Sequence, residues 1–173
     1  MSTLKTNAIQ TVAGQPLLNS TGSIIQVVYG DMGANVTQIA AQNNTVVNNI
    51  SVTITPTRST SKILLQAHMV HDGWYVNSWG FARNGSNIGG NTNTNSSNTI
   101  STNYQGQDSV NDRGWCLSTT YYYLDSPGTT SAITYAPTAC SSWSGDIYTL
   151  TINDRRNGDM RSLSSIVAME ILA

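Results

Sequence analysis

Two histidines and an aspartate are the residues whose spacing first suggests chemistry. His68 and His71 lie three positions apart, and Asp72 follows directly. Imidazole and carboxylate groups are common zinc ligands, but the surrounding pattern is that of a β-strand, in which residues three apart point to opposite faces. The two rings could share an ion only if a turn began by His71. We expect no metal site, with one histidine packed within the sheet layer and the other at its solvent-facing end.

The carboxylates are not spaced as in an enzyme. Glu170 is the only glutamate and falls in the last predicted strand, while most of the aspartates fall in predicted turns, where local hydrogen bonding accounts for them. A glycosidase needs two carboxylates that converge on one bond. The chain also has no Gly-x-Ser-x-Gly elbow, phosphate-binding loop or Gly-x-Gly-x-x-Gly motif. We expect no catalytic residue, no cofactor and no enzyme activity, and keep a carbohydrate-active enzyme as a remote alternative.

Aromatic residues beside polar loops suggest contact with sugars. Trp74, Tyr75 and Tyr104 lie in or next to predicted loops, and Asn93 and Asn95 belong to the polar stretch Asn-Thr-Asn-Thr-Asn-Ser-Ser-Asn. Exposed loops often carry binding residues, and aromatic faces beside hydrogen-bonding groups suit a sugar ring. These five residues are our candidate host-contact set, with a surface polysaccharide as the ligand.

A second aromatic group, Tyr121-Tyr122-Tyr123, lies inside a predicted strand. Because consecutive strand residues alternate sides, Tyr121 and Tyr123 share one face and Tyr122 takes the other. At least one tyrosine is therefore exposed or at an interface. For the aromatics as a whole, core packing or a subunit contact is the favoured alternative to sugar binding.

Cys116 and Cys140 are the only cysteines, which is too few for a zinc pattern. A disulfide between them is geometrically feasible if their strands are neighbours. Reduced thiols are the favoured alternative, because a chain assembled in a reducing cytoplasm usually keeps them.

Composition narrows the classes of partner. The 173 residues suit one domain, only 10% of them are charged, and the net charge is -1. Nucleic acids and anionic membranes both require clustered Lys and Arg, so we expect neither as a partner. No apolar run approaches the ~18 residues of a membrane span, and no basic segment precedes an apolar one near the start, so we expect assembly in the cytoplasm.

The elements that must position these residues are almost all strands. Within Ser51–Val70, apolar residues recur at every second position in two runs. The first run is Val52 and Ile54, and the second is Ile63, Leu65, Ala67 and Met69. Strands are predicted over Ile24–Tyr29, Thr45–Thr55, Ile63–His71, Trp79–Arg83, Asn87–Gly90, Ile100–Tyr104, Trp115–Leu124, Ala132–Tyr135, Ile147–Ile152 and Ser162–Leu172. Asn84-Gly85 predicts a tight hairpin. The fold class is all-β: residues 23–173 form an antiparallel β-sandwich or jelly roll.

Residues 1–22 differ from this module. Their apolar residues, Leu4, Ile9, Val12, Leu17 and Leu18, follow no sustained period, and Ala13-Gly14-Gln15-Pro16 breaks any regular element. We interpret them as an extended attachment or trimerisation arm that docks on another surface. A disordered tail is the alternative.

Several segments carry a resemblance to one family. Ser2–Gln10, Gly14–Val27, Ser61–Leu65, Phe81–Gly89, Leu124–Thr130 and Met169–Ile171 resemble structural proteins of tailed bacteriophages that infect marine bacteria or cyanobacteria. The resemblance implies a non-enzymatic, trimeric β-rich virion module that attaches through its leader to portal, tail or capsid proteins. It implies display as a fibre or tail appendage, with a capsid decoration or cement protein as the alternative, and it offers no residue-level site.

The uncharged surface rich in Asn, Thr and Tyr also suits contact between symmetry mates. We expect a homotrimer that packs around the leader and the inner sheet faces.

Overall fold

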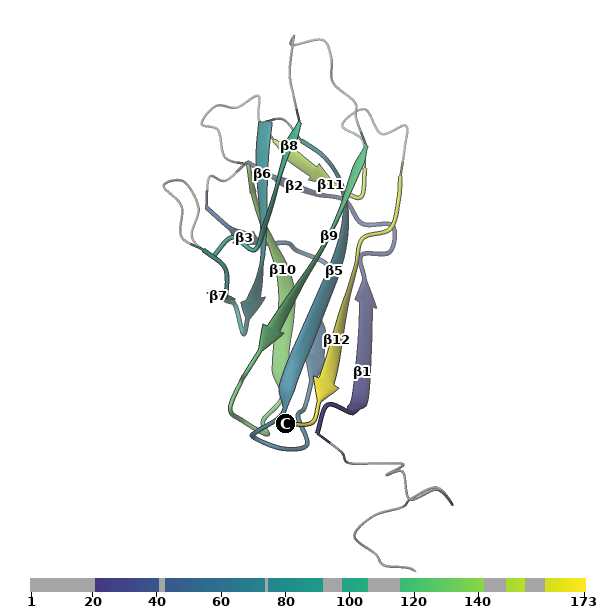
Figure 1. The fold of residues 1–173 in the computed structure, drawn as a ribbon. Helices are drawn as coiled ribbons and strands as arrows, with labels where there is room; N and C mark the ends of the chain where they lie inside the picture. The colour runs from purple at the N-terminus through teal and green to yellow at the C-terminus, as the bar shows by residue number, and fades with distance from the viewer. Residues whose placement is uncertain are drawn as a thin grey trace, which may run out of the picture.

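A computed structural model describes residues 21–40, 43–73, 75–91, 98–105, 116–141, 149–154 and 161–173 (Figure 1). Every regular element in these ranges is a β-strand, and the strands form two six-stranded sheets with antiparallel pairing. The two sheets pack face to face as a curled sandwich, which confirms the predicted fold class.

The first sheet is built around its longest strand, β5 (Lys62–Asp72). One edge of β5 pairs with β9 (Leu117–Asp125). The other edge pairs first with β12 (Ser165–Ile171) and then with the short β11 (Leu150–Ile152). Outside these lie β1 (Ile24–Asp31), paired with β12, and β2 (Thr37–Ile39), paired with β11.

The second sheet is built around β10 (Ile133–Ser141). One edge of β10 pairs with β6 (Tyr75–Arg83), and the other pairs with β4 (Val52–Ile54) and β3 (Thr45–Val46). The far edge of β6 holds β7 (Ser86–Ile88) and β8 (Ser101–Gln105).

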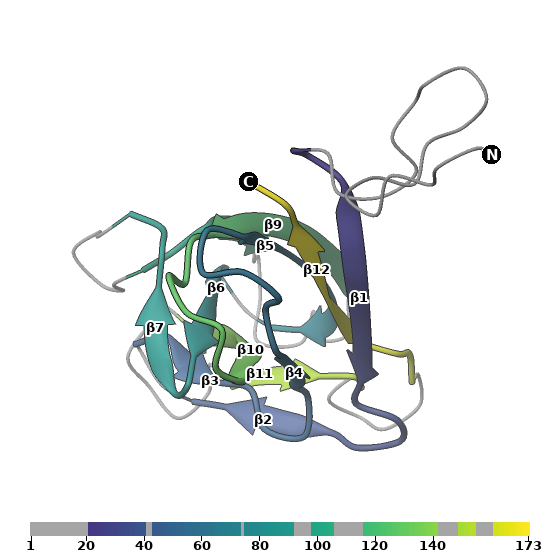
Figure 2. The same ribbon diagram turned by 90° about the horizontal axis from the view of Figure 1, so that it is seen from below.

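The chain winds between the sheets in the order of a jelly roll. The strand order is β1-β12-β5-β9 in one layer and β4-β10-β6-β7 in the other, so that successive long strands mostly change layer. Figure 2 shows β5, β9 and β12 forming one wall of the sandwich, opposite β3, β4 and β10. The predicted strands of Ser51–Val70 accordingly belong to different sheets, and residues 55–61 cross between them.

The core lies between the sheets and follows the predicted period of two. The six alternating residues of Ser51–Val70 are at most 3% exposed. From the second sheet, Trp79, Phe81 and Tyr135 fill the core and are fully buried. Leu172, just after the last strand, is also buried, so the C-terminal segment closes the core.

The predicted hairpin is present between β6 and β7, where Arg83 pairs with Ser86. Asn84 and Gly85 both have positive φ, 49° and 81°, as a two-residue hairpin turn requires. Other boundaries differ from the prediction. The Thr45–Thr55 segment is interrupted between β3 and β4, where Asn49 has a φ of 66°. Residues 37–39, where no strand was predicted, form the short strand β2.

β10 is longer than predicted because it continues through Pro137. A proline within a strand lacks the N–H that a neighbouring strand would accept. On the edge away from β6, pairing with β4 ends at Tyr135 and pairing with β3 begins at Thr138. Pro137 therefore sits in the gap between two partner strands, where its carbonyl still accepts the N–H of Val47 at 2.9 Å.

Candidate functional site

The module has two distinct ends. At one end, Gly22 and Leu172 are joined by a backbone hydrogen bond of 2.7 Å, and Ile171 pairs with both Ile24 and Lys62. At the other end, β5 finishes beside the start of β9, and Tyr75 pairs with Gln105. The eleven residues of β5 span about 34 Å between these ends. Figure 1 shows the C-terminus and the start of β1 together, opposite the start of β9.

Two of the candidate host-contact residues meet at the end away from the termini. The backbone of Tyr75 opens β6, and Tyr104 pairs with the next residue, Val76, so the two tyrosines occupy adjacent positions on neighbouring strands. Trp74, Asn93 and Asn95 lie outside the described residues, as do the arm residues Leu4, Ile9, Val12, Leu17 and Leu18.

Beneath this end, a buried histidine packs on a buried tryptophan. The rings of His71 and Trp79 are 4.7 Å apart, and the Trp79 indole N–H donates to Asn103 Oδ1 at 2.6 Å. His71 Nε2 lies 3.1 Å from Thr119 Oγ1. Burial lowers the pKa of His71 to about 4, so its ring is neutral near pH 7. It can hydrogen-bond but carries no charge there.

The other histidine, His68, lies on the outer face of the same strand, with its Nδ1 2.9 Å from Thr120 Oγ1. The prediction that the two rings take opposite faces is therefore confirmed, although the buried ring is the one nearer the strand end. Within the described ranges, no three side chains of His, Cys, Asp or Glu are grouped so that they could hold a metal ion.

A row of buried amide and hydroxyl groups continues from Trp79 across the second sheet. Asn77 pairs with Asn103 on β8 and with Ser141 on β10, so the three side chains share one face. Asn77 is 0% exposed, and in the described part of the chain neither atom of its amide has a hydrogen-bond partner. The row is polar but uncharged, and it offers hydrogen bonds without acid or base chemistry.

Asp125 departs from the expectation that most aspartates serve turns. A loop with Gly128 at a φ of 68° follows it, but the Asp125 carboxylate is buried and bonds elsewhere. It accepts the Tyr135 hydroxyl at 2.6 Å and the Arg83 guanidinium at 3.0 Å. Burial and the adjacent carboxylate raise the pKa of Tyr135. The cluster ties the end of β9 to the second sheet, and its tyrosine stays protonated.

Glu170 is another buried acid, and its hydrogen bonds also hold the fold together. It is 0% exposed, and its Oε1 accepts the Thr57 N–H at 2.7 Å and the Thr57 hydroxyl at 2.8 Å. Burial raises the pKa of Glu170, but the hydrogen bonds donated by the Thr57–Ser61 segment outweigh it, and the pKa lies below its usual value. Glu170 therefore fastens the crossover between β4 and β5 to the last strand.

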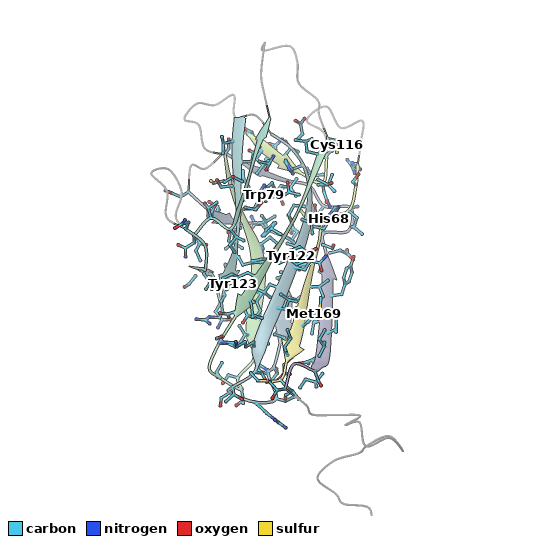
Figure 3. The ribbon with its side chains drawn as sticks, in the orientation of Figure 1. His68, Trp79, Cys116, Tyr122, Tyr123 and Met169 are labelled. Carbon is cyan, nitrogen blue, oxygen red and sulfur yellow. The ribbon has the colours of Figure 1, made fainter. Side chains whose placement is uncertain are left out.

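The most distinctive surface is the outer face of the first sheet. Register places two rows of side chains across its four long strands: Val27, Met169, Leu64 and Leu124 in one row, and Tyr29, Val167, Gln66 and Tyr122 in the next. A third, partial row adds Ile24 and Ile171. We call these ten residues the apolar face. Figure 3 labels Met169 and Tyr122 on it.

The tyrosine run behaves as predicted around this face. Tyr121 is buried, Tyr123 packs against the core, and Tyr122 is 56% exposed on the apolar face. Of the seven large hydrophobic residues that are exposed in the described chain, five belong to the apolar face. The surface is thus concentrated in one place rather than scattered.

The middle of the outer face of the second sheet is covered by the chain itself. Ser78, Ala82 and Thr138 there are at most 1% exposed. A Cβ on Gly80 would lie 2.5 Å from the Asn98 carbonyl oxygen, so the loop backbone rests directly on this sheet. A hydrogen bond of 3.2 Å from Asn44 to the same carbonyl joins two covering segments.

The expected trimer contact through inner sheet faces is wrong, because the inner faces pack against each other as the core. Of the faces described, only the apolar face remains as a broad apolar surface. The signal for it was in the sequence: Ile24–Val28, Ile63–Leu65 and Tyr121–Leu124 are largely continuous rather than alternating, which is typical of strands covered on both faces.

A shallow groove of about 380 Å³ lies at the seam between the sheets. It is lined by Asp31, the backbone and side chains of residues 46–51, Gly85, Thr134 and Ala136. Its volume is at the lower end of ligand sites, and it contains no aromatic side chain and one carboxylate, already bonded to the Gly33 N–H. It is a weaker candidate than the apolar face.

The cysteines are held apart. Cys116 precedes β9 in the first sheet, and Cys140 is buried in β10 of the second, and neither forms a disulfide.

No helix in the described ranges is long and apolar enough to cross a membrane. Comparison with known proteins gives no family model that matches the chain and no matching curated protein.

Proposed function

We propose that this protein is a non-enzymatic structural protein of a tailed-phage virion, assembled in the host cytoplasm and displayed as a fibre or tail-appendage module. The proposal combines the sequence resemblance with one structural observation about the two ends of the β-module. Gly22, the last residue of the proposed arm, forms a backbone hydrogen bond with Leu172 at one end. Tyr75 and Tyr104 lie at the other end.

This polarity suits a tethered module. An arm that docks on the portal, tail or capsid leaves the end with Tyr75 and Tyr104 pointing away from the particle, where it can meet a host surface polysaccharide. The rigid, buried packing of His71 and Trp79 beneath that end supports loops without supplying chemistry of its own. We further propose that three copies assemble as a homotrimer.

Attachment is tested by deleting residues 1–20, which spares the Gly22 hydrogen bond to Leu172. The proposal expects a folded module, checked by circular dichroism, that no longer enters particles when supplied to infected cells. Incorporation at the level of the full chain would contradict the attachment role.

Host contact is tested with Trp74→Ala and Tyr104→Ala. Both should weaken binding of the purified protein to host cells or surface polysaccharide without loss of folding. Thr130→Ala is the control, because Thr130 is exposed near the opposite end of the module. Equal binding by all three variants would contradict the adhesin role.

The capsid decoration is the second candidate, favoured by the broad apolar face, which a cement protein could lay on neighbouring subunits. Electron cryomicroscopy of the particle separates the two. Density at the tail or projecting from it supports the appendage, whereas a module lying flat across capsomers, with capsids weakened in its absence, supports decoration.

A further inference from the structure

We propose that the apolar face is a self-association surface, on which further copies of this chain pack. The inference deepens the homotrimer proposed above and rests on it in taking the partner to be another copy. The inference names the contact surface, which is the outer side of β1, β12, β5 and β9. This surface takes the place of the inner sheet faces through which the sequence predicted contact.

The apolar face is as large as the surface patches that proteins use for contacts. Four strands about 4.8 Å apart make a width of about 19 Å, and the Ile24–Tyr29 length of β1 adds about 17 Å, for a footprint near 320 Å². The largest apolar patch on a monomer is usually about 300–600 Å² and is often functional. Val27 is 60% exposed and Tyr29 is 56% exposed, so this patch is bare in the single chain.

The border of the apolar face has the composition of an interface rim. The next row, toward the end that carries Tyr75 and Tyr104, is polar. It contains Asp31, Ser165, His68 and Thr120. The opposite border carries Lys62, paired with Ile171. An apolar centre with a polar rim is the usual anatomy of a protein interface.

The absence of charge from the two central rows favours a copy of the same chain as the partner. Identical surfaces repel when they carry a net charge, because each group meets others of its own sign. The central rows of the apolar face contain Val, Met, Leu, Tyr and Gln only. Asp31 and Lys62 stand at opposite borders, so neither is forced into the centre of the contact.

The breadth of the face favours the same partner. A peptide or a small ligand needs a groove, and the groove described above lies at the seam of the sheets, lined by other residues. A four-stranded face is instead matched by another sheet, since two sheets pack about 10 Å apart. The chain itself supplies that second sheet.

The footprint also predicts the strength of the contact. A stable complex buries about 800 Å² on each partner, about two and a half times the footprint of the apolar face. The polar rim must therefore take part, and association should occur at micromolar rather than nanomolar concentration. The full-length chain at about 100 µM is the appropriate sample.

The test is a mass measurement by sedimentation velocity with Val27→Asp and Tyr122→Asp, singly and combined. Both side chains are more than half exposed, so the protomer should fold. Each variant buries an unpaired carboxylate in every copy of the contact and should raise the dissociation constant about 100-fold. The double variant should run at the 18.6 kDa of one chain. Val36→Asp, which changes an exposed apolar residue next to β2, should leave the mass unchanged.

A second measurement does not rely on charged variants. Gln66→Cys, in a Cys116→Ser background, places a thiol near the middle of the apolar face. Mild oxidation should join copies through it, whereas the background protein should stay uncrosslinked.

The outcomes separate this inference from the proposed function. A wild-type monomer at 100 µM, or an oligomer that the face variants leave intact, overturns the inference, even if the protein is found on virions. A dimer that the face variants dissociate supports the face and contradicts the homotrimer. A trimer that they dissociate supports both.

Discussion

Protonation of His71 should dominate the loss of stability between pH 6.5 and pH 4. Its ring is 0% exposed and packs 4.7 Å from Trp79. In the folded protein its pKa is lowered from 6.5 to about 4 by burial. The unfolded chain therefore takes up a proton as the pH falls below 6.5, while the folded chain does not until about pH 4.

The magnitude follows from linkage. Where the unfolded state binds more protons, the free energy of unfolding falls as the pH falls. The gap between 6.5 and about 4, at about 1.4 kcal/mol for each pH unit, gives a loss of about 3 kcal/mol. The stabilising state is the neutral one, so this contribution is complete above pH 6.5 and gone by about pH 4.

The assay is urea unfolding at stepped pH of the wild type and of His71→Gln, which has no titrating ring. The variant should be less stable at pH 7.5, because it loses the contact with Trp79, but the difference should shrink by about 3 kcal/mol toward pH 4. His68→Gln, on the outer face of the same strand, is the matched control for the loss of an imidazole that does not contact Trp79. Parallel profiles for wild type and His71→Gln, or an imidazole resonance of His71 that titrates near pH 6.5 in the folded protein, would refute the reasoning.

Two further predictions concern the buried acids. Glu170→Gln should lower the free energy of unfolding by about 2 kcal/mol at pH 7, because it gives up charge-assisted bonds from Thr57. The folded pKa of Glu170 is below its usual value, so the contribution is present above pH 4.5 and lost as the pH falls through the folded pKa. An equal cost at pH 7 and pH 3 in urea unfolding would contradict this account. Tyr135→Phe removes the hydroxyl that donates to Asp125 at 2.6 Å and should cost about 1–3 kcal/mol, against less than about 0.5 for the exposed control Tyr122→Phe. Similar costs for both tyrosines in chemical denaturation would show that the Asp125 bond contributes nothing.

The local features of the fold were predictable because they depend on neighbours in sequence. The hairpin followed from Asn84-Gly85, whose two residues accept positive φ, and the buried side of β5 followed from its alternation. What could not be predicted were contacts that join distant segments. Most aspartates were expected in turns, yet Asp125 is held in a buried cluster by Tyr135 and by Arg83, which is 42 residues away. No local pattern encodes such a partner.

The interruption of Thr45–Thr55 has a local and a distant cause. Asn48 and Asn49 lie at the break, where Asn49 has a φ of 66°. In addition, β3 and β4 pair with different parts of β10, on either side of Pro137. Of the host-contact candidates, the sequence could name residue types but not their placement. Tyr75 and Tyr104 are the two whose backbone the structure describes, and they lie on neighbouring strands.

The two outer faces of the sandwich show how residue size decides what covers a sheet. The second sheet presents small side chains outward, including Ser78, Gly80 and Ala82, and the chain's own backbone can lie directly on them. The first sheet presents large apolar side chains outward, and a thin loop could not bury a surface on which Val27 and Tyr122 stand more than half exposed. Burying such side chains takes a partner of comparable width, because the gain scales with the apolar area removed from water. The sequence thus builds one face that the chain's own backbone covers and leaves the other exposed, as the self-association that we propose requires.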